Sequence, residues 1–235
     1  MAKSKRKTSK SYKKSKKRYK KSYPQTISYK RVGNSQLAKW KDKKQLNGTA
    51  DQGENELGLE DALSVAQGLT GNDRIGQKIW ISTVQGRIRL RLTPTLESTY
   101  LDARVVIVLD TDCNKSSCTL TDIFGANKDE QEYKNLTQGN RFVILYDKHI
   151  VKNNTHGNGD ATAGKWFTDI VCNLEYYKQF KKPIVIDYDT SLTTGLIGSR
   201  TNNNICCLIF NNSGESLDTT CKWRIRFTDQ LLLVF

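Results

Sequence analysis

The first 31 residues of this 235-residue chain contain fourteen lysines and arginines and no acidic residue. Like charges at this density, without hydrophobic periodicity, cannot build a packed core, so we expect the segment to be disordered. Counting on to Lys44 gives 18 basic residues against Asp42 alone, whereas residues 45–235 contain 20 basic and 23 acidic residues. The formal net charge of +14 therefore belongs to one end of the chain. We predict a basic arm at residues 1–44 and a folded domain at residues 45–235.

The composition of the remainder favours a single β-rich domain. About 190 residues suffice for one sizeable core. Only 37% of the chain is apolar, while Asn, Thr, Ser and Gly are plentiful. No apolar run approaches the ~20 residues that span a bilayer, and the start lacks a signal-peptide core, so no membrane insertion is expected. In the reducing compartment that this implies, the six cysteines stay reduced.

Seven segments have the hydrophobic pattern of β-strands. They are residues 77–92, 104–110, 141–150, 166–177, 183–188, 204–210 and 222–228. In the first segment the apolar phase changes near residues 84–86, which predicts a β-bulge or tight turn there. Residues 57–69 have helical spacing, and residues 32–55 read as a polar transition. Because no helices alternate with the strands, we predict an all-β sandwich or barrel rather than a parallel α/β sheet.

A basic arm on a β domain without a helix to enter a groove predicts binding to phosphates rather than reading of bases. Tyr12, Tyr19, Tyr23 and Tyr29 lie among the lysines, and tyrosine rings stack on unpaired bases. A nuclear localisation signal is the alternative interpretation, and it is compatible with binding. The candidate nucleic-acid-binding residues of the arm are Lys3, Lys5, Arg6, Lys7, Lys10, Lys13, Lys14, Lys16, Lys17, Arg18, Lys20, Lys21, Lys30 and Arg31.

Two of the predicted strands carry three cations each on one face. These further candidate nucleic-acid-binding residues are Arg87, Arg89 and Arg91 in the first strand and Lys222, Arg224 and Arg226 in the last. If the two strands are neighbours, the six side chains form a basic patch on the sheet. The other interpretation is an ordinary solvated face whose cations pair with carboxylates of the slightly acidic body. The residue pattern alone leaves both interpretations open.

The sequence has no recognisable catalytic or metal-binding constellation. Cys113 and Cys118 lack the second short pair that a zinc ribbon needs. His149 and His156 come without a nucleophile motif, and the Gly-Asn-Gly at residues 157–159 lacks the Lys-Ser/Thr of a phosphate loop. We therefore predict no enzymatic activity, no cofactor and no metal ion.

An ordered series of segments resembles one group of proteins. Residues 67–79, QGLTGNDRIGQKI, are similar to the Gln-Gly and Arg-Ile-Gly-x-Lys-Ile segment that opens the first sheet strand of small icosahedral virus coat proteins. Residues 141–148, RFVILYDK, resemble the Arg-Phe-x-x-Leu-x-Asp pattern of the same proteins. The segments that match in kind and order are residues 105–110, 119–124, 204–212 and 223–229. Over residues 60–229 and the arm, the chain resembles capsid proteins of circular, Rep-encoding single-stranded DNA viruses and the RNA-packaging coat proteins of satellite necroviruses.

This resemblance implies a single eight-stranded jelly roll with two four-stranded antiparallel sheets. It also implies that about 60 copies close into an icosahedral shell with the arm inside. In that topology the first and last strands are neighbours. This would place Arg87, Arg89 and Arg91 near Lys222, Arg224 and Arg226. Satellite necrovirus shells bind calcium, but their ligands match no positions here, so no metal is carried over.

The resemblance leads us to expect a self-assembling capsid protein that packages single-stranded nucleic acid, with DNA favoured over RNA. Its locations would be the virion and, during assembly, the host nucleus, with a nuclear import receptor as a further partner. The apolar ending, residues 231–235, departs from the satellite coat proteins and either extends the last strand or packs against a neighbouring subunit. Residues 112–140 and 153–164 are expected to form variable outer loops. The alternatives are a satellite-virus coat protein that packages RNA and a non-viral, basic-tailed nucleic-acid-binding protein.

Overall fold

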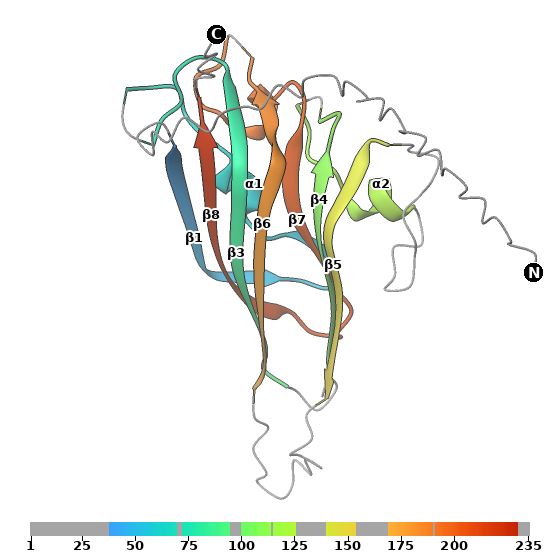
Figure 1. The fold of residues 1–235 in the computed structure, drawn as a ribbon. Coiled ribbons are helices and arrows are strands. Elements are labelled where there is room, and N and C mark those ends of the chain that lie inside the picture. Colours follow the sequence, from blue (N-terminus) through green and yellow to red (C-terminus); the bar gives the residue numbers. More distant parts are fainter. Residues whose placement is uncertain are drawn as a thin grey trace, which may run out of the picture. The chain divides into compact units, whose positions relative to one another are not determined.

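The computed structural model describes residues 38–69, 72–94, 100–113, 115–125, 140–153, 169–189 and 191–229, without the side chains of residues 44–47. In chain order its elements are β1 (Lys39–Ala50), β2 (Gly53–Glu56), α1 (Leu59–Ala62), β3 (Lys78–Leu92), β4 (Tyr100–Asp110), α2 (Leu120–Phe124), β5 (Phe142–Asn153), β6 (Ile170–Asp187), a 3₁₀ turn (Ile197–Ser199), β7 (Asn204–Asn211) and β8 (Leu217–Thr228) (Figure 1). The predicted disorder of the arm and its fourteen candidate binding residues lie outside the described residues.

The fold is a jelly roll. Sheet 1 has the strand order β1-β8-β3-β6, and sheet 2 has the order β2-β7-β4-β5. Every neighbouring pair is antiparallel. Successive strands alternate between the two sheets, except that β4 and β5 are neighbours in sheet 2, so the chain winds around one core. The predicted fold class, all-β with eight strands in two four-stranded sheets, is confirmed.

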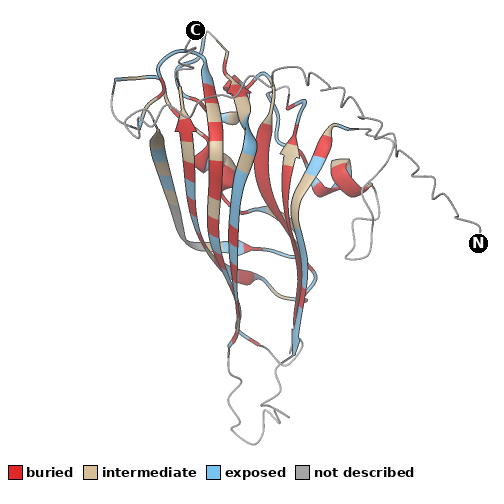
Figure 2. Cartoon of the chain, viewed as in Figure 1, coloured by how far each residue is buried: buried red, intermediate tan, exposed pale blue. Residues whose placement is uncertain are grey.

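The hydrophobic core fills the space between the inner faces of the two sheets (Figure 2). In β3, the residues from Ile88 to Leu92 alternate between buried aliphatic side chains and exposed arginines. In β8, buried Trp223, Ile225 and Phe227 alternate with more exposed cations. This two-residue period is required of a strand that buries one face and leaves the other in water.

The central strand β4 is buried on both faces, which explains its unbroken apolar run. Its inner face joins the main core, while Val106 and Val108 pack with α2 in a second apolar cluster. The short helix α2 is capped at its start by a reciprocal pair of hydrogen bonds. The Thr119 side-chain oxygen accepts from the Asp122 amide, and the Asp122 carboxylate accepts from the Thr119 amide. A capped helix therefore lies within residues 112–140, where the sequence suggested only a loop.

The expected polar transition at residues 32–55 is wrong, because β1 and β2 lie there. β1 pairs with β8 and is the edge strand of sheet 1. Lys39, Lys41 and Lys43 are each partly buried, and each places its ammonium group on a partner in the folded domain. Lys39 donates to Asp229 at 2.7 Å, and Lys41 donates to the carbonyl of Ser64 at 2.8 Å. The predicted boundary between residues 44 and 45 therefore falls inside β1, and Lys39, Lys41 and Lys43 belong to the folded domain.

The structure also corrects the number of strands after the long loops. One strand, β6, runs through Pro183, where the sequence predicted two strands. β6 is an edge strand, where a proline without an N–H is tolerated. The register steps from the pair Ile81–Ile184 to the pair Thr83–Gln179, so residues 180–183 bulge opposite Ser82. The predicted irregularity in β3 therefore exists, but at Ser82 rather than at residues 84–86.

The helix expected within residues 57–69 is present only as the four-residue α1. Within the described part of the chain, no helix has the length and the apolar character needed to cross a membrane.

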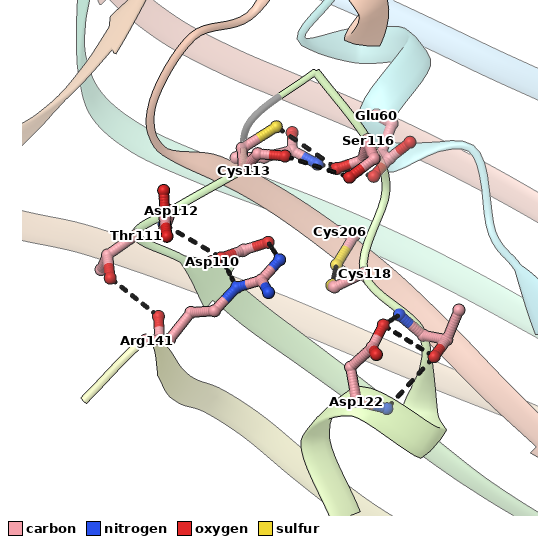
Figure 3. Close-up of polar contacts among 12 residues, drawn as sticks. Glu60, Asp110, Thr111, Asp112, Cys113, Ser116, Cys118, Asp122, Arg141 and Cys206 are labelled. Carbon is pink, nitrogen blue, oxygen red and sulfur yellow. Dashed lines mark hydrogen bonds and ion pairs between the residues drawn. The ribbon is translucent and has the colours of Figure 1, made fainter. Parts of the chain in front are cut away.

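A buried ion pair links the end of β4 to the start of β5. Asp110 is fully buried, and Arg141 donates from Nε and Nη2 to its two carboxylate oxygens, each at 2.9 Å (Figure 3). The Arg141 guanidinium also lies 4.7 Å from the centroid of the Phe142 ring. Because Asp110 has no contact with bulk solvent, its charge depends on this partner.

Arg141→Met is expected to lower the free energy of unfolding by about 3 kcal/mol, because it leaves the buried Asp110 carboxylate without its cation. Urea unfolding followed by circular dichroism measures the change. The matched control is Arg87→Met, which breaks an ion pair with Glu175 whose side chains are 77% and 76% exposed. That variant should change stability by less than about 0.5 kcal/mol. Equal effects of the two substitutions would contradict the structural role of the Asp110–Arg141 pair.

The Trp223 side chain occupies the space that a side chain at Gly86 would need. The two residues are register partners in the β3–β8 pair, and a Cβ built at Gly86 would lie 2.1 Å from the indole ring. Trp223 is only 1% exposed, and its indole N–H donates to the carbonyl of Leu57 at 2.7 Å. A glycine usually weakens a strand interior, but here the indole requires it.

Gly86→Ala is expected to lower the free energy of unfolding by about 1–3 kcal/mol, because the added methyl group overlaps the Trp223 ring. Chemical denaturation followed by tryptophan fluorescence measures the effect. Gly198→Ala is the control, since a Cβ there meets nothing within 4 Å and its φ is not in the left-handed region. We expect the control to change stability by less than about 0.5 kcal/mol. A wild-type denaturation curve for Gly86→Ala would show that the indole can move aside.

Candidate nucleic-acid interface

The six strand cations predicted from the sequence lie on neighbouring strands of sheet 1. In the β3–β8 register, Arg87 is opposite Lys222, Arg89 is opposite Thr220, and Arg91 is opposite Asp218. We call the outward surface that these strands present the basic face. The expected neighbourhood of the two strands is confirmed. However, β3 is the third strand of the chain, since β1 and β2 precede it.

Carboxylates neutralise part of the basic face. Arg224 donates from Nε and Nη2 to both carboxylate oxygens of Asp42, each at 2.7 Å. These hydrogen bonds hold the pKa of the Asp42 carboxyl below its usual range. Arg91 pairs with Asp169 at 2.7 Å, and a second carboxylate, Asp218, lies 3.8 Å from its guanidinium. The two interpretations left open by the sequence thus both describe part of this face.

The remaining cations are held more loosely. Arg87 pairs with Glu175 at 3.2 Å in an exposed geometry, which contributes little to stability. Among the described residues, no carboxylate lies within ion-pair distance of Arg89 or Lys222. These three cations can therefore be offered to a mobile anion such as a phosphate without breaking a strong internal contact.

Two aromatic side chains that the sequence reasoning missed belong to the same face. Trp40 of β1 is 40% exposed, and the guanidinium groups of Arg224 and Arg226 lie 5.7 and 5.5 Å from its ring centroid. Tyr177 of β6 is 64% exposed. The neighbouring Tyr176 is buried and makes an edge-to-face contact with Tyr146. Whether each ring faces solvent or the core depends on which face of its strand is buried. Composition does not indicate that face.

The basic face contains two open depressions. The larger, of about 630 Å³, runs across all four strands of sheet 1 and is lined by Asp42, Lys43, Gln85, Gly86, Arg87, Glu175, Tyr176, Tyr177, Lys222, Trp223 and Arg224. The smaller, of about 330 Å³, lies beside it and is lined by Arg89, Arg91 and residues 218–220. Both combine cations with hydroxyl or aromatic groups, which is the chemistry that contacts phosphates and bases.

Other reactive side chains have structural surroundings. All six cysteines are free and buried. The Sγ atoms of Cys118 and Cys206 are 2.8 Å apart near the start of α2 (Figure 3). Burial raises the pKa of the Cys221 thiol to about 12, which keeps it protonated and unreactive at neutral pH. His149 contacts Asp102 at 2.7 Å on sheet 2, away from the basic face.

Among the residues that the structure describes, no three His, Cys, Asp or Glu side chains form a group suited to a metal ion. His156 and residues 157–159 lie outside the described part of the chain. The cations, hydroxyl groups and aromatic rings of the basic face offer electrostatic attraction, hydrogen bonding and stacking.

Lys222→Ala is expected to lower the salt dependence of single-stranded DNA binding. If Lys222 contacts one phosphate, the slope of log affinity against log salt concentration should become shallower by about 0.7. Fluorescence anisotropy of a labelled oligonucleotide over a sodium chloride series measures the slope. The control is Lys148→Ala, which removes the same charge from the exposed edge strand of sheet 2. An equal change of slope in both variants would show that only net charge matters and that the basic face is not the contact surface.

Comparison of the sequence with models of protein families gives no match, and a search of curated proteins finds no significant similarity.

Proposed function

We propose that this chain is a viral capsid protein that self-assembles into a small icosahedral shell and packages single-stranded nucleic acid, with DNA favoured over RNA. The proposal rests on one observation: the basic arm is continuous in sequence with β1, a strand of the sheet that presents the basic face. The arm enters the fold at β1, and β1 is paired with β8 in the sheet that presents the basic face. A cargo held by the arm is thus tethered to the same sheet that offers further cations.

The jelly-roll domain supplies surfaces suited to contacts between copies. Two loops at one end of the sandwich are joined by a hydrogen bond from the Gln67 amide to the carbonyl of Thr193 at 2.8 Å. These loops expose apolar side chains, among them Leu69 at 97% exposure, and the others are Ile75, Leu192 and Leu196. Exposed apolar side chains gathered in this way are typical of protein–protein contact sites. The exposed apolar side chains support the assembly that we propose, in which neighbouring subunits would pack against this end.

The charge available for packaging follows from where the fold begins. Lys39, Lys41 and Lys43 are engaged with groups of the folded domain, so the arm proper is residues 1–37 with its fourteen cations. In a shell of 60 copies this gives roughly 800 positive charges, enough to neutralise on the order of 800 phosphates. A small DNA circle and a satellite-sized RNA both fit this charge, so DNA is favoured on the resemblance of the chain rather than on charge.

Location follows from the same proposal. The shell places the protein in the virion, and the lysine-rich arm can also be recognised by a nuclear import receptor of the host. Assembly in the nucleus would then bring the capsid protein to its DNA cargo.

Electron microscopy of the purified full-length protein tests assembly. We expect regular closed particles, from which extraction releases nucleic acid that DNase degrades and RNase leaves intact. The reverse nuclease result would assign the chain to the RNA-packaging alternative. A monomer that persists across protein and salt concentrations would overturn the capsid proposal and favour a non-viral, basic-tailed binding protein.

Removing the charge of the arm should separate assembly from packaging. Replacing the fourteen basic residues between Lys3 and Arg31 with glutamine keeps the length of the arm but removes its attraction for phosphates. We expect such shells to form but to sediment as largely empty particles, with a low ratio of absorbance at 260 nm to that at 280 nm. A Lys-to-Arg version of the same arm is the control and should package normally. Full nucleic-acid content in the glutamine version would show that the arm is not the packaging element.

A further inference from the structure

We propose that the larger depression of the basic face binds one unpaired nucleotide, with its base stacked on the exposed ring of Tyr177 and its phosphate held by Arg87 and Lys222. This inference rests on the proposed function and deepens it, because it assigns a base-binding position to the folded domain and restricts the cargo to unpaired bases. It concerns the described residues of sheet 1 and requires nothing of the arm.

The strand register places the required groups in two adjacent rows. In one row, Tyr177 is opposite Gln85, and Gln85 is opposite Arg224 on its other side. In the next outward-facing row, Arg87 lies between Glu175 and Lys222. Neighbouring strands are about 4.8 Å apart, and outward side chains on one strand recur about every 7 Å. A ring and two cations at these separations match the dimensions of a nucleotide, whose base and phosphate lie on either side of its sugar.

Tyr177 is held in a position that leaves its ring available. It lies on the edge strand β6, and its neighbour Tyr176 takes the inward position. Tyr177 is 64% exposed and lines the depression. A large aromatic surface beside the strand backbone that lines the depression offers a flat platform. Stacking on such a platform tolerates any base, because every base has a π face.

The cations beside the ring differ in how freely they can move. Arg224 is fixed by two hydrogen bonds to Asp42 and by its contact with the Trp40 ring. Arg87 and Lys222 have no comparable restraint, since the Arg87–Glu175 pair is exposed and weak. A phosphate can therefore replace Glu175 as the partner of Arg87 at little cost. Arg224 would form the fixed wall of the site, while the two mobile cations close on the phosphate.

The same geometry excludes a duplex from this site. In double-stranded DNA both faces of a base are covered by its neighbours in the stack, so no face is free for Tyr177. The basic face is a sheet surface, and none of the described helices lies on it to enter a groove and read paired bases. Selectivity for unpaired bases is therefore expected from the stacking position, while the arm alone would bind any polyanion.

Photo-crosslinking of the full-length protein to a labelled oligothymidine, followed by peptide mass spectrometry, tests the position directly. We expect a nucleotide adduct at Tyr177 with the single strand and none there with a duplex of the same length. Adducts confined to residues before β1 would overturn the inference. An equal adduct at Tyr177 with the duplex would overturn its selectivity for unpaired bases.

Affinity measured at raised salt, where the contribution of the arm is weakened, provides the second readout. Tyr177→Ala should weaken binding of oligothymidine by about fivefold to a hundredfold, the range of one base stacking on an aromatic ring. Tyr177→Phe keeps the ring and should change affinity less than about twofold. Tyr100→Ala is the matched control, because Tyr100 is 41% exposed on β4 of sheet 2. Equal affinity of Tyr177→Ala and Tyr177→Phe would overturn the stacking role.

These outcomes separate the inference from the function on which it rests. If shells assemble and package nucleic acid but the Tyr177 variants match the wild type, the nucleotide site is wrong and the capsid proposal stands. If the wild-type protein binds no single-stranded nucleic acid and forms no particles, the proposed function itself fails.

Discussion

The antiparallel pairing of β3 with β8 is the constraint on which the rest of the structure depends. It brings Trp223 over Gly86 on the inner side of sheet 1, and Arg87 beside Lys222 on the outer side. Because side chains alternate between faces, a slip of one residue would send the indole into water and the arginines into the core. The fit between an indole and a glycine therefore fixes the register that also creates the basic face. Core packing and surface charge are two consequences of one pairing.

The bulge at Ser82 allows both halves of β3 to place their apolar side chains in the core. Before it, Ile79 and Ile81 are buried, and after it the buried positions are Val84, Gly86 and those that follow at two-residue intervals. Without a change of phase, the second half of the strand would direct its arginines inward. The bulge thus reconciles the apolar residues of the first half with the cations of the second.

The fold was largely predictable wherever the local pattern reports burial on a sheet. β8 alternates cleanly and β4 is continuously apolar, and both were predicted near their true positions. β1 was missed because its inward residues are lysines, whose burial depends on partners such as Asp229 that lie far along the chain. β6 was divided in two because Pro183 ends a central strand but is tolerated at an edge, and edge position is a property of the assembled sheet.

For the candidate site, the sequence predicted the six cations but not the other groups that surround them. The six strand cations follow from the sequence, but their neighbourhood needed the jelly-roll topology, and their carboxylate partners Asp42 and Asp169 come from other strands or loops. Tyr177 could not be distinguished from Tyr176, because two adjacent tyrosines in a strand face opposite sides and the pattern does not state which side is buried. The structure shows that the Tyr176 ring is in the core and that the Tyr177 ring is on the surface.

The arm and the basic face would contribute differently to holding the nucleic acid that we propose as the cargo. The arm carries fourteen cations without a nearby carboxylate in the sequence, so the phosphate binding that we propose for it would be non-specific and steeply dependent on salt. The basic face holds half of its cations in internal ion pairs, which reduces its net attraction but fixes the positions of the groups around the larger depression. Dense charge along a sequence attracts a polyanion without ordering it, whereas charge and aromatic surface held on a sheet can order it. In the packaging that we propose, the charge of the arm would collect the strand, and the ordered groups of the basic face would hold it.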